Sequence, residues 1–132
     1  MTYPILKGTE AQVKWAEDIR TKAISKYDFL SSVSPEDLSA NAAMYAATKQ
    51  YMMSLVTVGC DDYAAYDALK AIEKEIEAAK DEIMDGVKRS DPTRAQKMAE
   101  AAAVEKDIIL KAAMNALTSA DNAAAWIKWS KR

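Results

Sequence analysis

Apolar residues recur at three- and four-residue steps along most of the chain, which is the pattern of helices that bury one face. The first such run follows Thr9-Glu10-Ala11-Gln12. This sequence has the form of a capping box, in which a hydroxyl and an amide each bond a backbone N–H at the start of a helix. We therefore expect a first helix from about Glu10 to Phe29 or Leu30.

A second and a third helix follow from the next start and stop signals. Ser34-Pro35-Glu36-Asp37 combines a capping hydroxyl, a proline suited to the first helical position and two acids. The apolar stripe behind it predicts a helix that includes Leu38 and ends near Val58 and Gly59. Asp61 or Asp62 then caps a third helix with a clean apolar stripe, which we expect to end near Gly86.

The last part of the chain predicts one long helix and one short helix. Ser90-Asp91-Pro92 repeats the combination of a cap and a proline, and the helix behind it carries many alanines, which let a neighbouring helix approach closely. Thr118 to Asp121 contains a further cap, before a short helix with Trp126 and Ile127. Short connections make successive helices antiparallel neighbours.

The predicted fold is therefore all-α: one domain over residues 1–132, an antiparallel up-down bundle of four helices plus a short C-terminal helix. Alternatively, the third and fourth helices form a longer antiparallel hairpin that reaches a dimer partner.

Composition narrows the chemistry that the protein can perform. The 132 residues include no His, one Cys and three Gly. Catalytic triads with an imidazole base, His-ligated metals and intramolecular disulfides are thereby excluded, and no glycine-rich phosphate loop is present. The acidic neighbours of Cys60 oppose an activated thiol. We expect no enzymatic activity, no catalytic residue, no cofactor and no metal.

Hydropathy and cysteine content indicate the cellular compartment in which the protein is expected. No run of apolar residues is long enough to cross a bilayer, and the first ten residues lack the apolar core of a signal peptide. The single Cys60 suits a reducing compartment. We expect a cytoplasmic protein that does not bind membranes.

Charge is unevenly distributed behind a net charge of −2. Residues 61–88 hold four basic and nine acidic side chains, whereas residues 89–132 hold eight basic and five acidic ones. One interpretation is that the third and fourth helices attract each other along their sides. The other is that the third helix presents a protein-binding face that imitates a nucleic-acid backbone. The candidate protein-binding residues are Glu73, Glu77 and Asp81, together with Tyr63 and Tyr66 beside the Gly59 turn.

The C-terminal run interleaves aromatic rings with positive charge. Indole rings stack on bases and cations contact phosphates, so this run is a candidate nucleic-acid-binding site. Its residues are Trp126, Lys128, Trp129, Lys131 and Arg132. Alternatively, Trp126 and Ile127 close the open end of the bundle while the cations stay in water. Trp15 either packs against the Trp126 segment or is an exposed anchor.

The beginning of the first helix resembles a motif of small helical proteins from phages, plasmids and their bacterial hosts. Leu6 to Arg20 resembles their sequence Leu-x-Gly-Ser/Thr-Glu-Lys-Gln-x-x-Trp-Ala-Glu-x-Ile-Arg, with Ala11 in place of the Lys. Ala123, Trp126, Ile127 and Ser130 to Arg132 loosely resemble the Ala-x-x-Trp-Ile-x-x-Arg segment at the C-terminus of those proteins. The Asn-Arg pair at the end of that segment is missing from this chain. The resemblance carries no assigned activity. It implies an origin in a mobile element and packing of the first helix against the C-terminal segment.

These features together favour a non-enzymatic helical protein that acts by binding another protein. Small mobile-element proteins without catalytic residues often block a host machine, so the specific hypothesis is inhibition of a nucleic-acid-handling or defence complex, as anti-CRISPR proteins do. The alternatives are a nucleic-acid accessory protein that uses the C-terminal run, and a self-assembling structural protein that buries the third helix in a homodimer.

Overall fold

A computed structural model describes residues 3–34 and 42–132, and within these ranges the chain is all-helical, as the sequence predicts. The only β-type pairing of the described residues is an isolated parallel bridge between Lys7 and Asn122. The elements in chain order are α1 (Glu10–Ser32), α3 (Ala42–Ser54), the 3-10 helix η1 (Leu55–Thr57), α4 (Asp62–Met84), α5 (Arg94–Ser119) and α6 (Ala123–Ser130).

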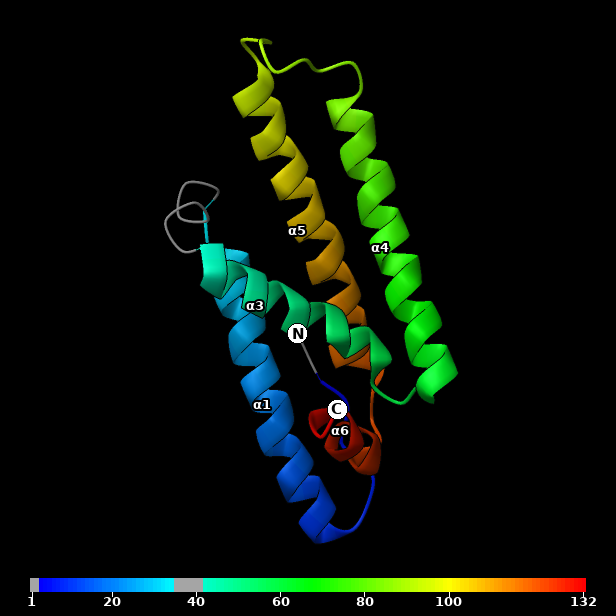
Figure 1. Cartoon of the computed structure of the whole chain (residues 1–132). Helices are drawn as coiled ribbons and strands as arrows, with labels where there is room; N and C mark the ends of the chain where they lie inside the picture. The colour runs from blue at the N-terminus through cyan, green and yellow to red at the C-terminus, as the bar shows by residue number, and fades with distance from the viewer. Residues whose placement is uncertain (1–2, 35–41) are drawn as a thin grey trace.

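The helices form a bundle that is closed at one end by a short helix (Figure 1). α4 and α5 form an antiparallel hairpin, and its far end extends beyond the other helices. α1 packs against α5 and α6, while α3 crosses the bundle obliquely and contacts both α1 and α5. α6 lies between α1 and the rest of the bundle, at the end opposite the α4–α5 turn.

Two of the predicted helix starts are confirmed. The Thr9 hydroxyl accepts a hydrogen bond from Gln12 N at 3.2 Å, and the Gln12 side chain accepts one from Thr9 N at 3.1 Å. Asp61 caps α4 by accepting from Ala64 N at 2.8 Å. α4 ends at Met84, slightly before the predicted stop near Gly86.

The other three predicted starts have different outcomes. The cap expected within Thr118 to Asp121 is wrong, because the next residue, Asn122, caps α6 by accepting from Ala125 N at 3.1 Å. The expected start of the second helix at Pro35 and Leu38 lies outside the described residues. The start at Ser90-Asp91-Pro92 is wrong, because α5 begins at Arg94 after Thr93. Asp91 instead accepts hydrogen bonds from both N and Oγ1 of Thr93, which stabilises a turn ahead of the helix.

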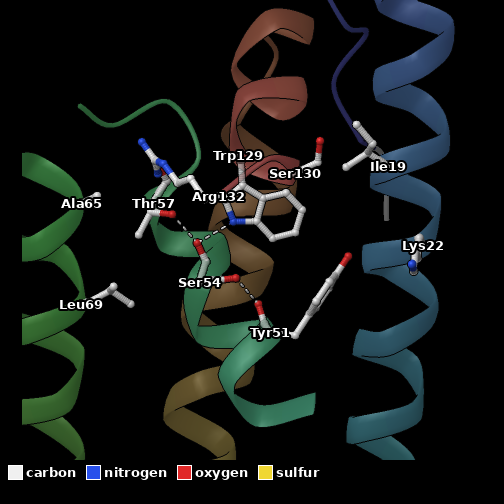
Figure 2. A pocket seen from close by; sticks show the side chains of 10 residues that line it. All are labelled: Ile19, Lys22, Tyr51, Ser54, Thr57, Ala65, Leu69, Trp129, Ser130 and Arg132. Atoms are coloured by element: carbon white, nitrogen blue, oxygen red, sulfur yellow. Dashed lines mark hydrogen bonds between the residues drawn. The ribbon is translucent and has the colours of Figure 1, made fainter. Parts of the chain in front are cut away.

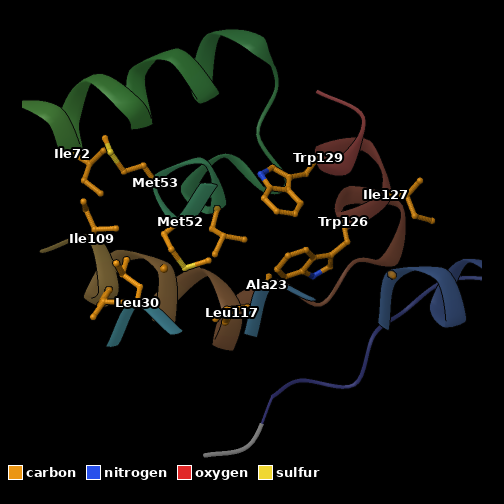
Figure 3. Close-up of a cluster of buried hydrophobic side chains, with 14 of the residues drawn as sticks. Ala23, Leu30, Met52, Met53, Ile72, Ile109, Leu117, Trp126, Ile127 and Trp129 are labelled. Atoms are coloured by element: carbon orange, nitrogen blue, oxygen red, sulfur yellow. The ribbon is translucent and has the colours of Figure 1, made fainter. Parts of the chain in front are cut away.

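The C-terminal helix supplies a large part of the core. Trp126 has no exposed surface, and its Nε1 donates to Ala120 O at 3.1 Å, so the buried N–H is satisfied. Trp129 packs edge-on against Trp126, with ring centroids 5.6 Å apart (Figure 3). Its Nε1 donates to Ser54 O at 2.9 Å. The interpretation that Trp126 and Ile127 close the end of the bundle is confirmed.

The segment before α1 fastens the first helix to the last. Lys7 N donates to Asp121 O at 2.7 Å, and Ala123 N donates to Lys7 O at 2.9 Å. Gly8 has a φ of +155° beside this pairing, and a Cβ there would lie 3.1 Å from Ala123 Cβ. Leu6 and Ala16 are buried in the same core as Trp126. The packing of α1 against the C-terminal segment is thus present in the structure.

Replacement of Trp126 tests how far α6 supports the fold. We expect Trp126→Ala to lower the free energy of unfolding by about 3–5 kcal/mol, because it removes a fully buried indole and leaves a cavity. Trp15→Ala is the matched control. Trp15 is 49% exposed, so its removal is expected to cost about 1 kcal/mol or less.

Urea unfolding followed by far-UV circular dichroism measures both values. Equal losses in the two variants would contradict the role of Trp126 as the end closure.

Candidate protein-binding site

The tyrosine pair and the acidic residues predicted as protein-binding lie on one face of α4. Along α4 these residues are spaced three or four positions apart once Lys70, which lies between the tyrosines and the acids, is included as the sixth. At 3.6 residues per turn this places them within an arc of about 80°. All six side chains are exposed, and Tyr63 and Tyr66 are exposed by 87% and 62%. We name this surface the α4 stripe: Tyr63, Tyr66, Lys70, Glu73, Glu77 and Asp81.

The acidic half of the α4 stripe borders a hollow between α3 and α4. The hollow has a volume of about 400 Å³, and Glu73, Glu77 and Asp81 line its α4 side. Lys49 and Gln50 line it from α3. The three carboxylates are therefore gathered at one concave surface and do not stand on an isolated rod.

A buried carboxylate that the sequence analysis missed lies at the base of this hollow. Glu105 of α5 is only 7% exposed. Lys49 Nζ donates to its Oε1 at 2.7 Å, and Lys80 Nζ donates to its Oε2 at 3.1 Å. Burial by itself would raise the pKa of the Glu105 carboxyl, but these hydrogen bonds and the two positive charges outweigh it. The pKa therefore lies below its ordinary value of 4.5.

Tyr45 lies beside this carboxylate. Its hydroxyl is buried and has no hydrogen-bond partner among residues 3–34 and 42–132. Burial, and secondarily the charge of Glu105, raises the pKa of Tyr45. The Lys49 ammonium lies 5.7 Å from the Tyr45 ring centroid, so one lysine contacts both the ring and the carboxylate.

The sequence did contain a signal for Glu105. It lies between Ala101 and Ile109 at four-residue steps, on the buried face of α5. An acid in an apolar stripe indicates a buried charge that needs a partner. The partners themselves could not be read from this pattern, because they lie on two other helices.

The pairing also bears on the interpretation that α4 and α5 attract each other through opposite charge. Among the described residues, the ion pair between these helices joins Lys80 of α4 to Glu105 of α5. In this pair α4 supplies the base and α5 the acid, whereas the expected attraction was between an acidic α4 and a basic α5. The acidic residues of the stripe face solvent. Glu73 forms an ion pair with Lys70 of the same helix at 3.4 Å, and Glu77 and Asp81 form no ion pair with any described residue.

The C-terminal run separates into buried rings and exposed cations. Trp126 and Trp129 are buried, so the expectation that their faces stack on bases is wrong. Lys128 is exposed, while Arg132 donates from Nη1 to Thr57 O at 2.9 Å and from Nη2 to Cys60 O.

Trp15, in turn, is half-exposed and contacts the end of the Trp126 segment. It is 49% exposed and its ring lies under Lys131, whose Nζ is 5.1 Å from the ring centroid. Lys131 is exposed, so this contact joins the start of α1 to the end of α6 at the surface of the protein.

Comparisons of the chain with known protein families, curated proteins and solved structures find no match. In the described ranges, no three His, Cys, Asp or Glu side chains are grouped so that they could hold a metal ion. The described helices include none of the length and hydropathy needed to span a membrane. The α4 stripe is therefore defined as a candidate by its geometry and charge alone.

The lowered pKa of Glu105 predicts how stability depends on pH. A carboxyl whose pKa is lower in the folded state stabilises the protein above its unfolded pKa, and this contribution is lost as pH falls through the folded pKa. We expect Glu105→Gln to reduce the free energy of unfolding by about 1–3 kcal/mol at pH 7. The difference should shrink as pH falls below the ordinary value of 4.5.

Glu100→Gln provides the matched control, because Glu100 is an exposed acid on the same helix. Urea unfolding between pH 7 and pH 3 gives the comparison. A difference between Glu105→Gln and the wild type that stays constant over this range would contradict the assignment.

Proposed function

We propose that this protein is a non-enzymatic helical binding protein and that it presents the α4 stripe to a basic surface of another protein. One observation carries the proposal: two tyrosines and three carboxylates share one exposed face of α4.

The chemistry of the α4 stripe favours a partner rich in Arg and Lys. Carboxylates accept charge-assisted hydrogen bonds from guanidinium and ammonium groups, and tyrosine rings attract the same cations at their faces. Tyr is also enriched among residues that dominate binding energy at protein interfaces. The Lys70 ammonium already lies 5.5 Å from the Tyr66 ring centroid, an arrangement that an arginine of a partner could replace.

A basic groove built to hold nucleic acid is the surface that such a stripe would fit best. Carboxylates spaced along a helix offer negative charge in a row, as a phosphate backbone does. The resemblance of Leu6 to Arg20 to proteins of mobile elements supports a host nucleic-acid-handling or defence complex as the target, as for anti-CRISPR proteins. Such a role belongs in the cytoplasm, where these complexes act.

Charge reversal of the stripe tests the proposal. The variant Glu73→Lys, Glu77→Lys and Asp81→Lys is compared with the wild type by affinity capture from bacterial lysate, with and without nuclease. We expect a protein partner that survives nuclease treatment and is lost from this variant, because each contact to a basic surface becomes repulsive.

A second triple variant controls for net charge. Glu75→Lys, Glu82→Lys and Glu100→Lys changes the charge equally, but these exposed residues lie away from the α4 stripe. It should keep the partner, with about the wild-type affinity. Circular dichroism is used to check that both variants are folded. Equal capture by the wild type and by the stripe variant would refute the proposal, as would a partner that disappears with nuclease.

A further inference from the structure

A second concave surface lies on the other side of α3, between α1 and α4. This cleft has a volume of about 510 Å³, within the range of small-molecule sites (Figure 2). Ile19 lines it from α1, Leu69 lines it from α4, and Tyr51 and Trp129 lie between them. The cleft does not overlap the α4 stripe.

The walls of the cleft are apolar and its charges are all positive. Leu69, Ile19 and the rings of Tyr51 and Trp129 provide the apolar surface, and the two rings pack edge to face with centroids 5.3 Å apart. Lys22 and Arg132 are the charged residues of the lining, and none of the residues that line the cleft is acidic. Arg132 is held by the carbonyls of Thr57 and Cys60, so its charge is fixed in place.

Two hydrogen-bond donors at the α1 side, the Lys22 ammonium and the Tyr51 hydroxyl, have no hydrogen-bond partner among the described residues. The Lys22 ammonium is exposed and forms no ion pair or hydrogen bond with any described residue. The Tyr51 hydroxyl points toward α1, on the side where Lys22 lies (Figure 2). Burial raises the pKa of Tyr51, so its hydroxyl keeps its proton at neutral pH and can donate. Lys26, 5.2 Å from the Tyr51 ring centroid, adds positive charge nearby.

We propose that this cleft binds an amphiphilic monocarboxylate of medium chain length. The carboxylate would accept hydrogen bonds from the Lys22 ammonium and the Tyr51 hydroxyl, and the apolar chain would lie against Leu69, Ile19 and Trp129. The negative charge of the proposed ligand follows from the lining of the cleft, which offers cations and no acid. The small size of the cleft selects one extended aliphatic or arylalkyl chain over a folded partner.

Decanoate is the probe for this proposal, at concentrations below micelle formation. Titration of ¹⁵N-labelled protein with decanoate is expected to give saturable shifts of backbone amides around the cleft, with one site per chain. Decyltrimethylammonium has the same chain and the opposite charge, and we expect it to bind at least about tenfold more weakly. Decanol, which lacks the carboxylate, should also bind more weakly.

Substitution of the exposed lysine tests the site without disturbing the core. We expect Lys22→Gln to weaken decanoate binding by up to about fivefold, as loss of one exposed ion pair does. Lys22→Glu should weaken it by at least about tenfold, because a carboxylate then faces a carboxylate. The matched control is Lys14→Gln, an exposed lysine of α1 that does not line the cleft.

Several outcomes would overturn the proposal. These are the absence of saturable binding at millimolar decanoate, equal binding of decyltrimethylammonium or decanol, shifts centred away from the cleft, and unchanged affinity in Lys22→Glu. The triple reversal of Glu73, Glu77 and Asp81 should leave decanoate binding intact. The proposal for the cleft and the proposal for the α4 stripe are therefore tested independently of each other.

Discussion

The ion pairs of the buried Glu105 constrain how three helices fit together. A carboxylate that is withdrawn from water costs several kcal/mol unless cations are placed against it. Lys49 of α3 and Lys80 of α4 provide those cations, so both helices must hold a defined register relative to α5. Any sliding of α3 or α4 would leave an unpaired charge in the core, whereas sliding of purely apolar surfaces is penalised far less. This requirement fixes the position of the α4 stripe relative to the hollow below it.

α3 lies between two concave surfaces, and each side of the helix lines one of them. Lys49 and Gln50 line the acidic hollow, whereas Tyr51 and Ser54 line the cleft toward α1. α3 has 13 residues, compared with 23 in α4 and 26 in α5, so it covers only part of the bundle. A short, oblique helix between longer ones leaves grooves on both sides. The negative hollow and the positive cleft are therefore two results of the same packing arrangement.

Local chemistry explains which parts of this structure the sequence could predict. The capping box at Thr9, the cap at Asp61 and the apolar stripes of α1 and α4 depend on neighbours within four residues, and these predictions are confirmed. The start of α5 was misplaced because Asp91 serves equally well as a cap or as a turn residue. The direction of the Trp126 and Trp129 rings and the partners of Glu105 depend on contacts between distant segments, which periodicity does not encode. The steps of three and four residues that place the tyrosines and the acids of the α4 stripe on one face are also local, so this face can be derived from the sequence.

The pairing of Lys7 with Asp121 and Ala123 has a consequence for the order of folding. These hydrogen bonds join segments separated by nearly the whole described chain, whereas α4 and α5 are consecutive helices connected by residues 85–93. Contacts between distant segments form late, because the chain entropy lost on closing a long loop must be compensated by contacts made earlier. We expect the α4–α5 hairpin to collapse first and α1 to reach its final position only when α6 is formed. During synthesis on the ribosome, α1 would then emerge before α6 and dock only after α6 has formed.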